Sequence, residues 1–183
     1  MRSGLLIAAF FALVSPAQAD EWHSTENSRF EFETTFEGVA TPGEFTHFLV
    51  VLDLDPASPD INGLRVTVDL TAADMGDPDM NAVLYEPAWF DTEHFAVAEF
   101  ESGDIVEQSP GRFLATGMLD LKGTSKLVAV PFLWTRSGDT ASMLGELLLD
   151  RTEFDVGSGE WASDDAIGIN VKLMFAVQLE LRK

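Results

Sequence analysis

The feature that most constrains the fold is a period-two alternation of apolar and polar residues that recurs along the chain. It is clearest near the C-terminus, where every second residue from Ile167 to Leu181 is apolar. Successive side chains of a β-strand point to opposite faces, so this pattern predicts a strand with one apolar face. A strand of about 16 residues spans roughly 50 Å. That length suits a strongly twisted antiparallel barrel.

The same alternation predicts several further strands upstream. Turn-forming pairs such as Asp55-Pro56, Ser58-Pro59 and Gly123-Thr124 separate some of them. Strands that follow one another through short turns favour antiparallel pairing over a parallel sheet. The predicted strands are Arg29–Phe36, Phe45–Leu54, Leu64–Leu70, Phe95–Phe100, Phe113–Leu121, Val128–Trp134 and Leu147–Arg151.

One segment departs from the alternation and predicts a short helix. Asp77-Pro78 provides an N-cap and a proline at the first helical position, and Met80, Val83 and Leu84 follow at helical spacing. Pro87 then interrupts, before a second short turn at Ala88–Phe90. We therefore predict an all-β protein: an antiparallel, eight-stranded, lipocalin-like barrel with a short helical insertion. Such a barrel has no open edges and can hold one small ligand. Two sheets packed around a filled core are the alternative.

The N-terminal residues predict export. Arg2 supplies a positive charge, Leu5–Val14 is an apolar run, and Ala17-Gln18-Ala19 has the small-residue pattern of a cleavage site. A run of about ten apolar residues is too short to span a membrane, which needs roughly 20. We therefore predict a signal peptide over residues 1–19, cleavage after Ala19, and a single periplasmic domain over residues 20–183. An uncleaved anchor helix is the alternative.

Composition narrows the class of ligand. The net charge of −20 disfavours nucleic acid and anionic lipid surfaces as partners. The chain has no cysteine, which excludes disulfides and thiol chemistry. It has 14 Phe and a single Tyr, and phenylalanine carries no polar group that needs a partner. Such a set indicates an apolar interior, either a filled core or a lined cavity.

Motifs for catalysis or metal binding are lacking in the sequence. The three histidines have no metal-ligand spacing, the aspartate-rich stretches do not match an EF-hand, and no G-x-S-x-G occurs. We therefore predict neither an enzyme nor a metal site. Arg151 continues the apolar face of Leu147 and Leu149 and is expected to point inward. A buried guanidinium needs a partner. That partner is expected to be a carboxylate or the headgroup of a ligand.

Five segments, in order along the chain, resemble motifs of the YceI-like family of exported, lipocalin-like barrels. Three features depart from that pattern. Thr34-Thr35-Phe36 stands where many members have a histidine, Ala96 replaces a proline, and Asp74–Asp79 is acidic where relatives are often basic. These departures concern contacts to a polar headgroup rather than the barrel. The segments that resemble the family are Thr41–Phe48, Pro87–Asp91, Phe95–Ser102, Ala115–Val128 and Asp150–Gly157.

The resemblance implies an elongated apolar cavity for a long isoprenoid chain, such as a polyprenyl lipid or a quinone tail, and no catalysis or further cofactor. Because some relatives are encoded with a membrane b-type cytochrome, that cytochrome is a candidate partner. The alternative is an assembly module for such a cytochrome, without a ligand cavity. The oligomeric state stays open. The residues expected to line the cavity are Phe30, Phe32, Phe48, Val50, Leu52, Val66, Val68, Trp89, Phe90, Phe100, Leu119, Val130, Phe132, Trp134, Leu147, Leu149, Val171, Leu173 and Phe175, with Arg151 as the headgroup contact.

Overall fold

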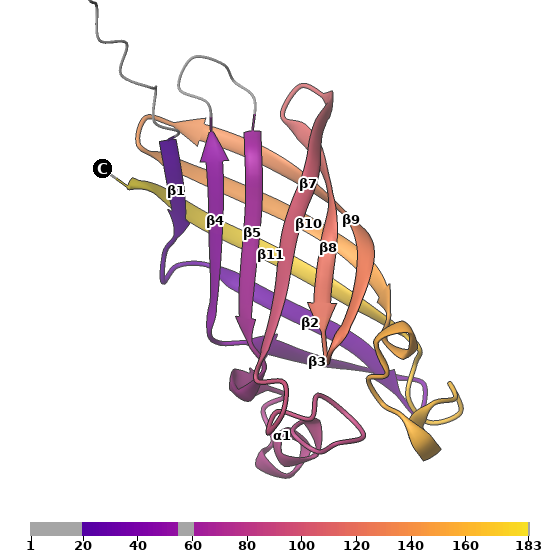
Figure 1. Ribbon diagram of the computed structural model, residues 1–183. Helices are drawn as coiled ribbons and strands as arrows, with labels where there is room; N and C mark the ends of the chain where they lie inside the picture. Colours follow the sequence, from indigo (N-terminus) through magenta and orange to yellow (C-terminus); the bar gives the residue numbers. More distant parts are fainter. Residues whose placement is uncertain (1–19, 55–60, 183) are drawn as a thin grey trace, which may run out of the picture.

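A computed structural model describes residues 20–54 and 61–182, and its dominant feature is a closed antiparallel barrel (Figure 1). The ring closes because β1 pairs with β4 on one side and with β11 on the other. The prediction of an eight-stranded antiparallel barrel is therefore confirmed, and the alternative of two packed sheets is wrong. The strands of the ring are β1 (Asp20–Ser24), β4 (Phe48–Leu54), β5 (Ile61–Asp69), β7 (Val97–Ser109), β8 (Arg112–Leu121), β9 (Thr124–Ser137), β10 (Thr140–Asp150) and β11 (Asn170–Arg182).

Three further strands extend the wall beyond the ring. These are β2 (Arg29–Phe36), β3 (Val39–Phe45) and the two-residue β6 (Ala73–Asp74). The long strand β11 makes the extension possible, because its residues 179–182 pair with β1 while residues 172–176 pair with β2. The β2–β3 hairpin therefore continues the wall below β1, toward the lower end of the barrel in Figure 1.

The predicted helical insertion is confirmed as α1 (Pro78–Leu84), which lies below the barrel in Figure 1. The carboxylate of Asp77 caps it by accepting hydrogen bonds from the backbone N–H groups of Asp79 and Met80, at 2.9 and 3.1 Å. Single 3₁₀ turns η1 (Leu70–Ala72), η2 (Arg151–Phe154) and η3 (Gly159–Trp161) complete the helical content. In the part of the chain that the structure describes, no helix has the length and apolarity to cross a membrane.

The single strand predicted over Phe45–Leu54 is wrong, because the chain bends at Thr46 and His47. The backbone N–H of Thr46 donates to the carbonyl of Ala72 at 3.1 Å, and the N–H of Asp69 donates to the carbonyl of His47 at 3.0 Å. At this bend the chain changes partners, since β3 pairs with β6 and β4 pairs with β5. The bend therefore separates the extension from the closed ring.

The barrel interior divides into two apolar clusters, and one of them fills the upper end as a solid plug. In this plug the rings of Trp22 and Trp134 meet edge to face at 5.9 Å, and those of Phe113 and Phe132 stack at 5.5 Å. The guanidinium of Arg136 covers the Trp22 ring at 4.8 Å. Aromatic pairs in these geometries add to the stabilisation from buried area. The plug therefore closes the end of the barrel opposite α1.

Gly117 on β8 is required by close contact with β7. A Cβ atom at this position would overlap the carbonyl oxygen of Glu101 and lie 2.6 Å from the Cα of Ser102, beside a bulge in β7. Both obstacles are backbone atoms that cannot rotate away. We expect Gly117→Ala to lower the free energy of unfolding by about 2 kcal/mol through overpacking. Urea denaturation followed by circular dichroism measures this change.

Gly103→Ala is the matched control, because it changes a glycine of the same bulge. The nearest heavy atom to a Cβ there, the carbonyl oxygen of Thr116, is 3.8 Å away, which is an ordinary contact. We expect a change below about 1 kcal/mol for this variant. Equal losses of stability in the two variants would contradict the contact argument for Gly117.

Candidate functional site

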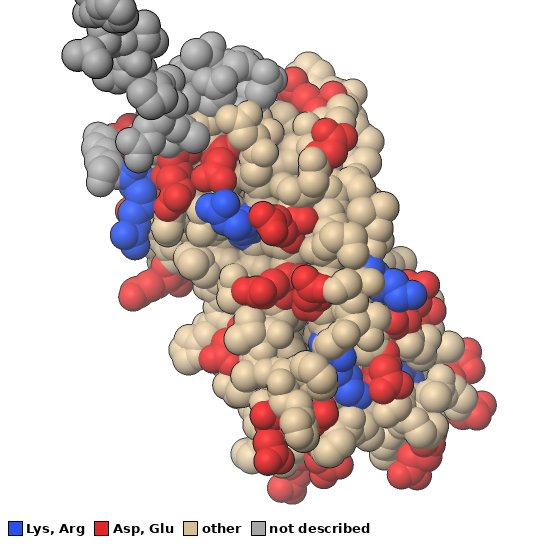
Figure 2. Space-filling view, in the orientation of Figure 1, with Lys and Arg blue, Asp and Glu red and all other residues tan. Residues whose placement is uncertain are grey.

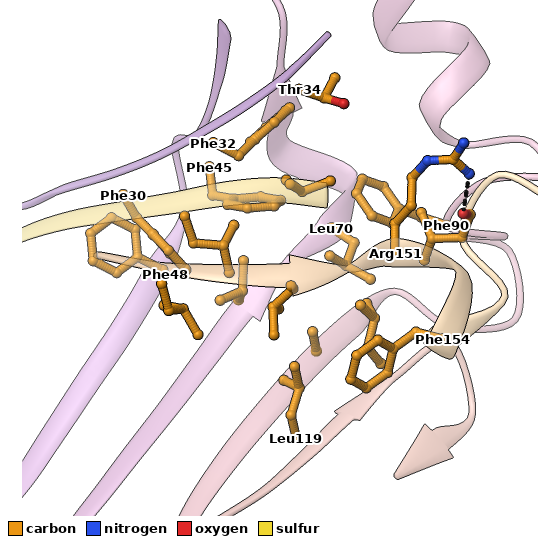
Figure 3. Close-up of a pocket in the computed structure, with 18 of the residues that line it drawn as sticks. Phe30, Phe32, Thr34, Phe45, Phe48, Leu70, Phe90, Leu119, Arg151 and Phe154 are labelled. Carbon is orange, nitrogen blue, oxygen red and sulfur yellow. Dashed lines mark hydrogen bonds between the residues drawn. The ribbon is translucent and has the colours of Figure 1, made fainter. Parts of the chain in front are cut away.

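The lower half of the barrel encloses a cavity of about 470 Å³ between the plug and α1 (Figure 3). This volume lies in the range of small-molecule binding pockets. Apart from Thr34, Thr41 and Arg151, the cavity is lined by aliphatic, aromatic and methionine side chains. The interior of the barrel is therefore neither wholly hollow nor wholly filled: the upper end is packed and the lower end is open space.

Phenylalanine side chains from separate strands meet on one wall of the cavity, as Figure 3 shows for Phe30, Phe45 and Phe48. The ring of Phe30 on β2 lies 5.3 Å from that of Phe45, 5.7 Å from that of Phe48 and 6.4 Å from that of Phe175. Phe32 lies 5.0 Å from Phe45. Because β2, β3, β4 and β11 each contribute, the hydrogen-bonded wall holds these rings in place.

Most of the residues expected to line a cavity lie on its wall. Leu52, Phe132 and Trp134 are the exceptions, because they point into the barrel at the level of the plug and pack against its other members. Alternation gives the face of a side chain but not its height along the barrel axis. The expected residues that lie on the wall are Phe30, Phe32, Phe48, Val50, Val66, Val68, Trp89, Phe90, Phe100, Leu119, Val130, Leu147, Leu149, Val171, Leu173 and Phe175.

The sequence prediction missed two groups of lining residues at the lower end. The first comes from α1 and the loop before it and includes Met75, Met80 and Val83. Met80 and Val83 already stood out by their helical spacing, but that spacing did not show which side of the helix meets the barrel. The second group comes from the loop between β10 and β11, where Phe154 and Trp161 approach the cavity. Phe154 belongs to a segment that resembles a family motif.

Arg151, at the start of η2, is only 4% exposed and organises the loop between β10 and β11. Its guanidinium donates only to backbone carbonyl oxygens, at 2.6 to 3.2 Å. Figure 3 shows the group turned away from Phe30 and Phe48, with one of these bonds dashed. The accepting carbonyls are those of Val156, Gly157, Trp161, Ser163, Ile167 and Gly168.

These bonds give Arg151 a set of protein partners other than the carboxylate that was one of the two expectations; the other, a ligand headgroup, stays a prediction. An arginine has five N–H donors, and here all three nitrogen atoms donate to carbonyls. Within the described residues, no carboxylate forms an ion pair with the guanidinium. Burial lowers the pKa of Arg151, while the charge of Asp150 raises it, and the group stays protonated at neutral pH. The arginine thus holds the loop that forms part of the wall, and its N–H groups are already bonded to protein carbonyls.

Asp150 caps the same loop, and this gives a prediction about pH. Its carboxylate accepts from the hydroxyl and the backbone N–H of Thr152 at 2.5 and 2.9 Å, and the hydroxyl bond is the main cause of its lowered pKa. A lowered folded-state pKa stabilises the fold above the unfolded value, and this contribution is lost as the pH falls through the folded value. We therefore expect Asp150→Asn to be less stable than the parent at pH 7, with the difference shrinking below pH 3.8.

Urea midpoints measured between pH 7 and pH 3 test this expectation. Asp104→Asn, on the exposed side of β7, controls for the loss of one negative charge. A difference between the parent and Asp150→Asn that stays constant over this range would contradict the proposed role of the ionised carboxylate.

Histidine and carboxylate side chains do not assemble into a metal site in the part of the chain that is described. No group of three or more His, Cys, Asp or Glu residues there could hold an ion. The His94 ring contacts Asp91 at 2.9 Å at the surface, and this hydrogen bond raises the pKa of His94. The cavity is thus the feature of the described residues with the clearest capacity to bind a small molecule.

Comparison with known proteins shows the same architecture elsewhere. The crystal structure of BcnA from Burkholderia cenocepacia superposes with a TM-score of 0.78 at 28% identity, covering 82% of this chain and 95% of that one. A polyisoprenoid binding domain from Saccharophagus degradans, implicated in plant cell wall breakdown, superposes with a TM-score of 0.71 at 14% identity, covering 90% of this chain and all of the other. At that identity the likeness shows the fold alone.

Sequence comparison gives the family. A UPF0312 protein from Shewanella oneidensis is 26% identical over 131 residues, which are 70% of this chain and 69% of the relative. The sequence profile of the YceI-like domain matches residues 20–179, nearly the whole described barrel. The match includes β1 and most of β11, the two strands that close the ring, as well as the loop held by Arg151. The chain therefore belongs to the YceI-like family.

Proposed function

We propose that this protein binds a long isoprenoid lipid in the barrel cavity and sequesters or carries it without catalysing a reaction. The observation that carries the proposal is the cavity of about 470 Å³ with an almost wholly apolar wall, closed at one end by the plug. A ligand for such a cavity must be apolar and uncharged over the part that the wall encloses. The relative from Saccharophagus degradans, described as a polyisoprenoid binding domain, supports the same class of ligand.

The energetics of tail burial support this proposal. Each buried methylene group contributes about 0.8 kcal/mol, so a buried tail of about 20 carbons has a gross driving force well above 10 kcal/mol. Ordering of the tail and loss of its translational freedom offset a large part of that. The remainder is sufficient for stable binding without a charged anchor. An apolar wall of Phe, Leu and Val is therefore enough to hold the ligand.

A quinone tail is one candidate within this class, and a membrane b-type cytochrome is the corresponding candidate partner. Both proposals rest on the family resemblance. The alternative, an assembly module with a filled lumen, is less well supported because the lower half of the barrel holds open space.

Export to the periplasm also belongs to this proposal. The signal peptide expected over residues 1–19 lies outside the described residues, and the family match begins at residue 20. Edman sequencing of the protein from a periplasmic extract tests the expected cleavage after Ala19. A mature chain that begins at Asp20 supports the proposal, whereas an intact N-terminus in the membrane fraction opposes it.

Organic extraction of the purified protein followed by mass spectrometry tests the proposed ligand class. The protein is produced from the full chain, purified without detergent, and extracted with chloroform and methanol. We expect an isoprenoid lipid at a substoichiometric to equimolar amount. The unliganded fraction is then incubated with the C20 alcohol geranylgeraniol and extracted again. Failure to retain any isoprenoid in both experiments would overturn the proposal.

A further inference from the structure

The cavity opens to solvent at the end where α1 lies, because apolar side chains there line the cavity and are also exposed. Met80 and Val83 of α1 are 36% and 39% exposed, and Phe36 at the end of β2 is 44% exposed. These three residues form the rim of the cavity. A lipid whose tail lies against Phe30 and Phe175 would place its polar end at this rim, since the opposite end of the barrel is filled.

The cations at this end already have protein groups as hydrogen-bond partners. Arg151 is the one charged residue on the cavity wall as described, and each of its nitrogens donates to a backbone carbonyl. Lys122, in the turn between β8 and β9, donates to the carbonyl of Asp155 at 2.6 Å and lies 3.6 Å from its carboxylate. Every nitrogen of the Arg151 guanidinium therefore already has a partner, and the Lys122 ammonium is held by Asp155, so neither group is free to turn toward a phosphate at the rim.

Acidic residues surround the rim instead. The segments 34–46, 71–94 and 151–168, which supply the rim and the lower wall, contain no Lys or Arg other than Arg151. Figure 2 shows acidic side chains gathered around the lower end of the molecule, where α1 lies. Unscreened carboxylates around an opening produce a negative potential that repels anions. Exposed acidic residues of these three segments include Glu37, Asp79, Glu86, Glu160 and Asp164.

The cavity wall also carries uncharged polar groups, among them those of Thr34, Thr41 and Trp89. Thr34 and Thr41 face each other across the β2–β3 ladder, and both line the cavity. Their hydroxyls donate to the carbonyls of Gly168 and Val39, at 3.3 and 3.1 Å, so the oxygens remain free to accept from a ligand. Trp89 also lines the cavity, and its buried Nε1–H has no hydrogen-bond partner in the described structure. These groups suit a hydroxyl or another neutral oxygen-bearing end.

We infer that the cavity selects isoprenoids whose polar end is uncharged, such as alcohols, and rejects the same tails when they end in phosphate or diphosphate. This inference rests on the proposed function and adds a headgroup preference to it. The selection comes from two features together. The N–H groups of Arg151 already donate to backbone carbonyls, and the carboxylates around the rim repel an anion. Burial of the tail supplies the affinity, and the residues at the rim discriminate between ligands by the charge of the headgroup.

Two ligands with the same C20 tail test the inference, geranylgeraniol and geranylgeranyl diphosphate. Binding is followed by the fluorescence of the protein, since Trp89 and Trp161 line the cavity. We expect the alcohol to bind at least about tenfold more tightly than the diphosphate at low ionic strength, and the ratio to fall in 0.5 M salt, where charges beyond a few ångströms are screened. Equal affinities at low salt would overturn the headgroup preference alone. Binding of neither ligand would overturn the proposed function as well.

Variants locate the origin of the preference. Asp79→Asn, Glu160→Gln and Asp164→Asn together remove three charges at the rim, and we expect the diphosphate to gain affinity several-fold while the alcohol is unaffected. The control combines Glu26→Gln in the turn after β1, Asp104→Asn on β7 and Glu180→Gln on β11. All three residues are exposed. It changes the net charge equally. If the control restores diphosphate binding as well as the rim variant does, the overall charge is responsible and the rim assignment is wrong.

Discussion

Arg151→Ala is expected to lower the free energy of unfolding by at least about 4 kcal/mol, because it leaves several buried carbonyl oxygens without their donor. The loop between β10 and β11 crosses the lower end of the barrel. Its other backbone bonds, such as those of the N–H groups of Ser158 and Gly168 to the carbonyls of Ala88 and Thr35, do not supply donors to the carbonyls that Arg151 serves. Six carbonyls of the loop point at one guanidinium. Small domains have only about 5 to 15 kcal/mol of stability. A large unfolded fraction is therefore expected at 37 °C.

Urea denaturation followed by circular dichroism measures this loss. Arg151→Lys keeps the charge but offers three donors from one point, so we expect it to recover only a minor part of the stability. Arg65→Ala is the matched control, because Arg65 is half-exposed and pairs with Asp53 at 3.3 Å. Surface pairs of this kind contribute about 1 kcal/mol or less. If Arg151→Ala lowers stability no more than Arg65→Ala does, the account of Arg151 as the centre of the loop is wrong.

The part of the fold that the sequence could predict is the part with clear alternation. The long apolar face from Ile167 to Leu181 predicted β11, and the residues of β8 and β10 showed the same period. The cap and proline of α1 were also visible, because capping depends on residues next to each other in the chain. These are local signals, and the structure follows them closely.

The elements that were missed lack such a local signal. Strand β1 has only five residues. It is held as a strand by its neighbours β11 and β4, whose residues Leu181 and Leu52 pair with Trp22 from the two sides. Strand β3 contains Pro42 and Gly43, which seldom occur within strands, and its pairing with β2 and β6 fixes it there. β1 owes its structure to partners distant in sequence, and β3 to the preceding strand β2 and the more distant β6. Alternation within one segment does not reveal either kind of pairing.

The candidate site shows the same division between local and distant information. The inward faces were predictable from alternation, but the boundary between plug and cavity was not, because it depends on how side chains from eight strands fill each level. Leu52 and Val50 lie two residues apart on β4 and share one face, yet only Val50 reaches the cavity wall. The donors of Arg151 were equally hidden, since their partners are backbone atoms that the loop brings together only after it folds.

Val128→Trp is expected to weaken the binding of a C20 isoprenoid about 100-fold, because the indole would occupy space that the tail needs. The side chain of Val128 on β9 lines the cavity, and its partner across the ladder is Gly117, which has no side chain to compete for room. Displacing about four methylene groups of the ligand costs roughly 3 kcal/mol, which corresponds to that change in affinity. Titration of the unliganded fraction of each protein with geranylgeraniol measures it.

The stability of the unliganded protein distinguishes a blocked cavity from a damaged barrel. Filling an existing space adds contacts, so we expect the urea midpoint of Val128→Trp to stay at or above that of the parent. Leu127→Trp is the matched control, because Leu127 is the preceding residue on the opposite face of β9 and is 70% exposed. It should bind the lipid as the parent does. If Val128→Trp is folded and still binds geranylgeraniol with the parent's affinity, the tail does not occupy this cavity. In that case the apolar wall serves another purpose than holding a lipid.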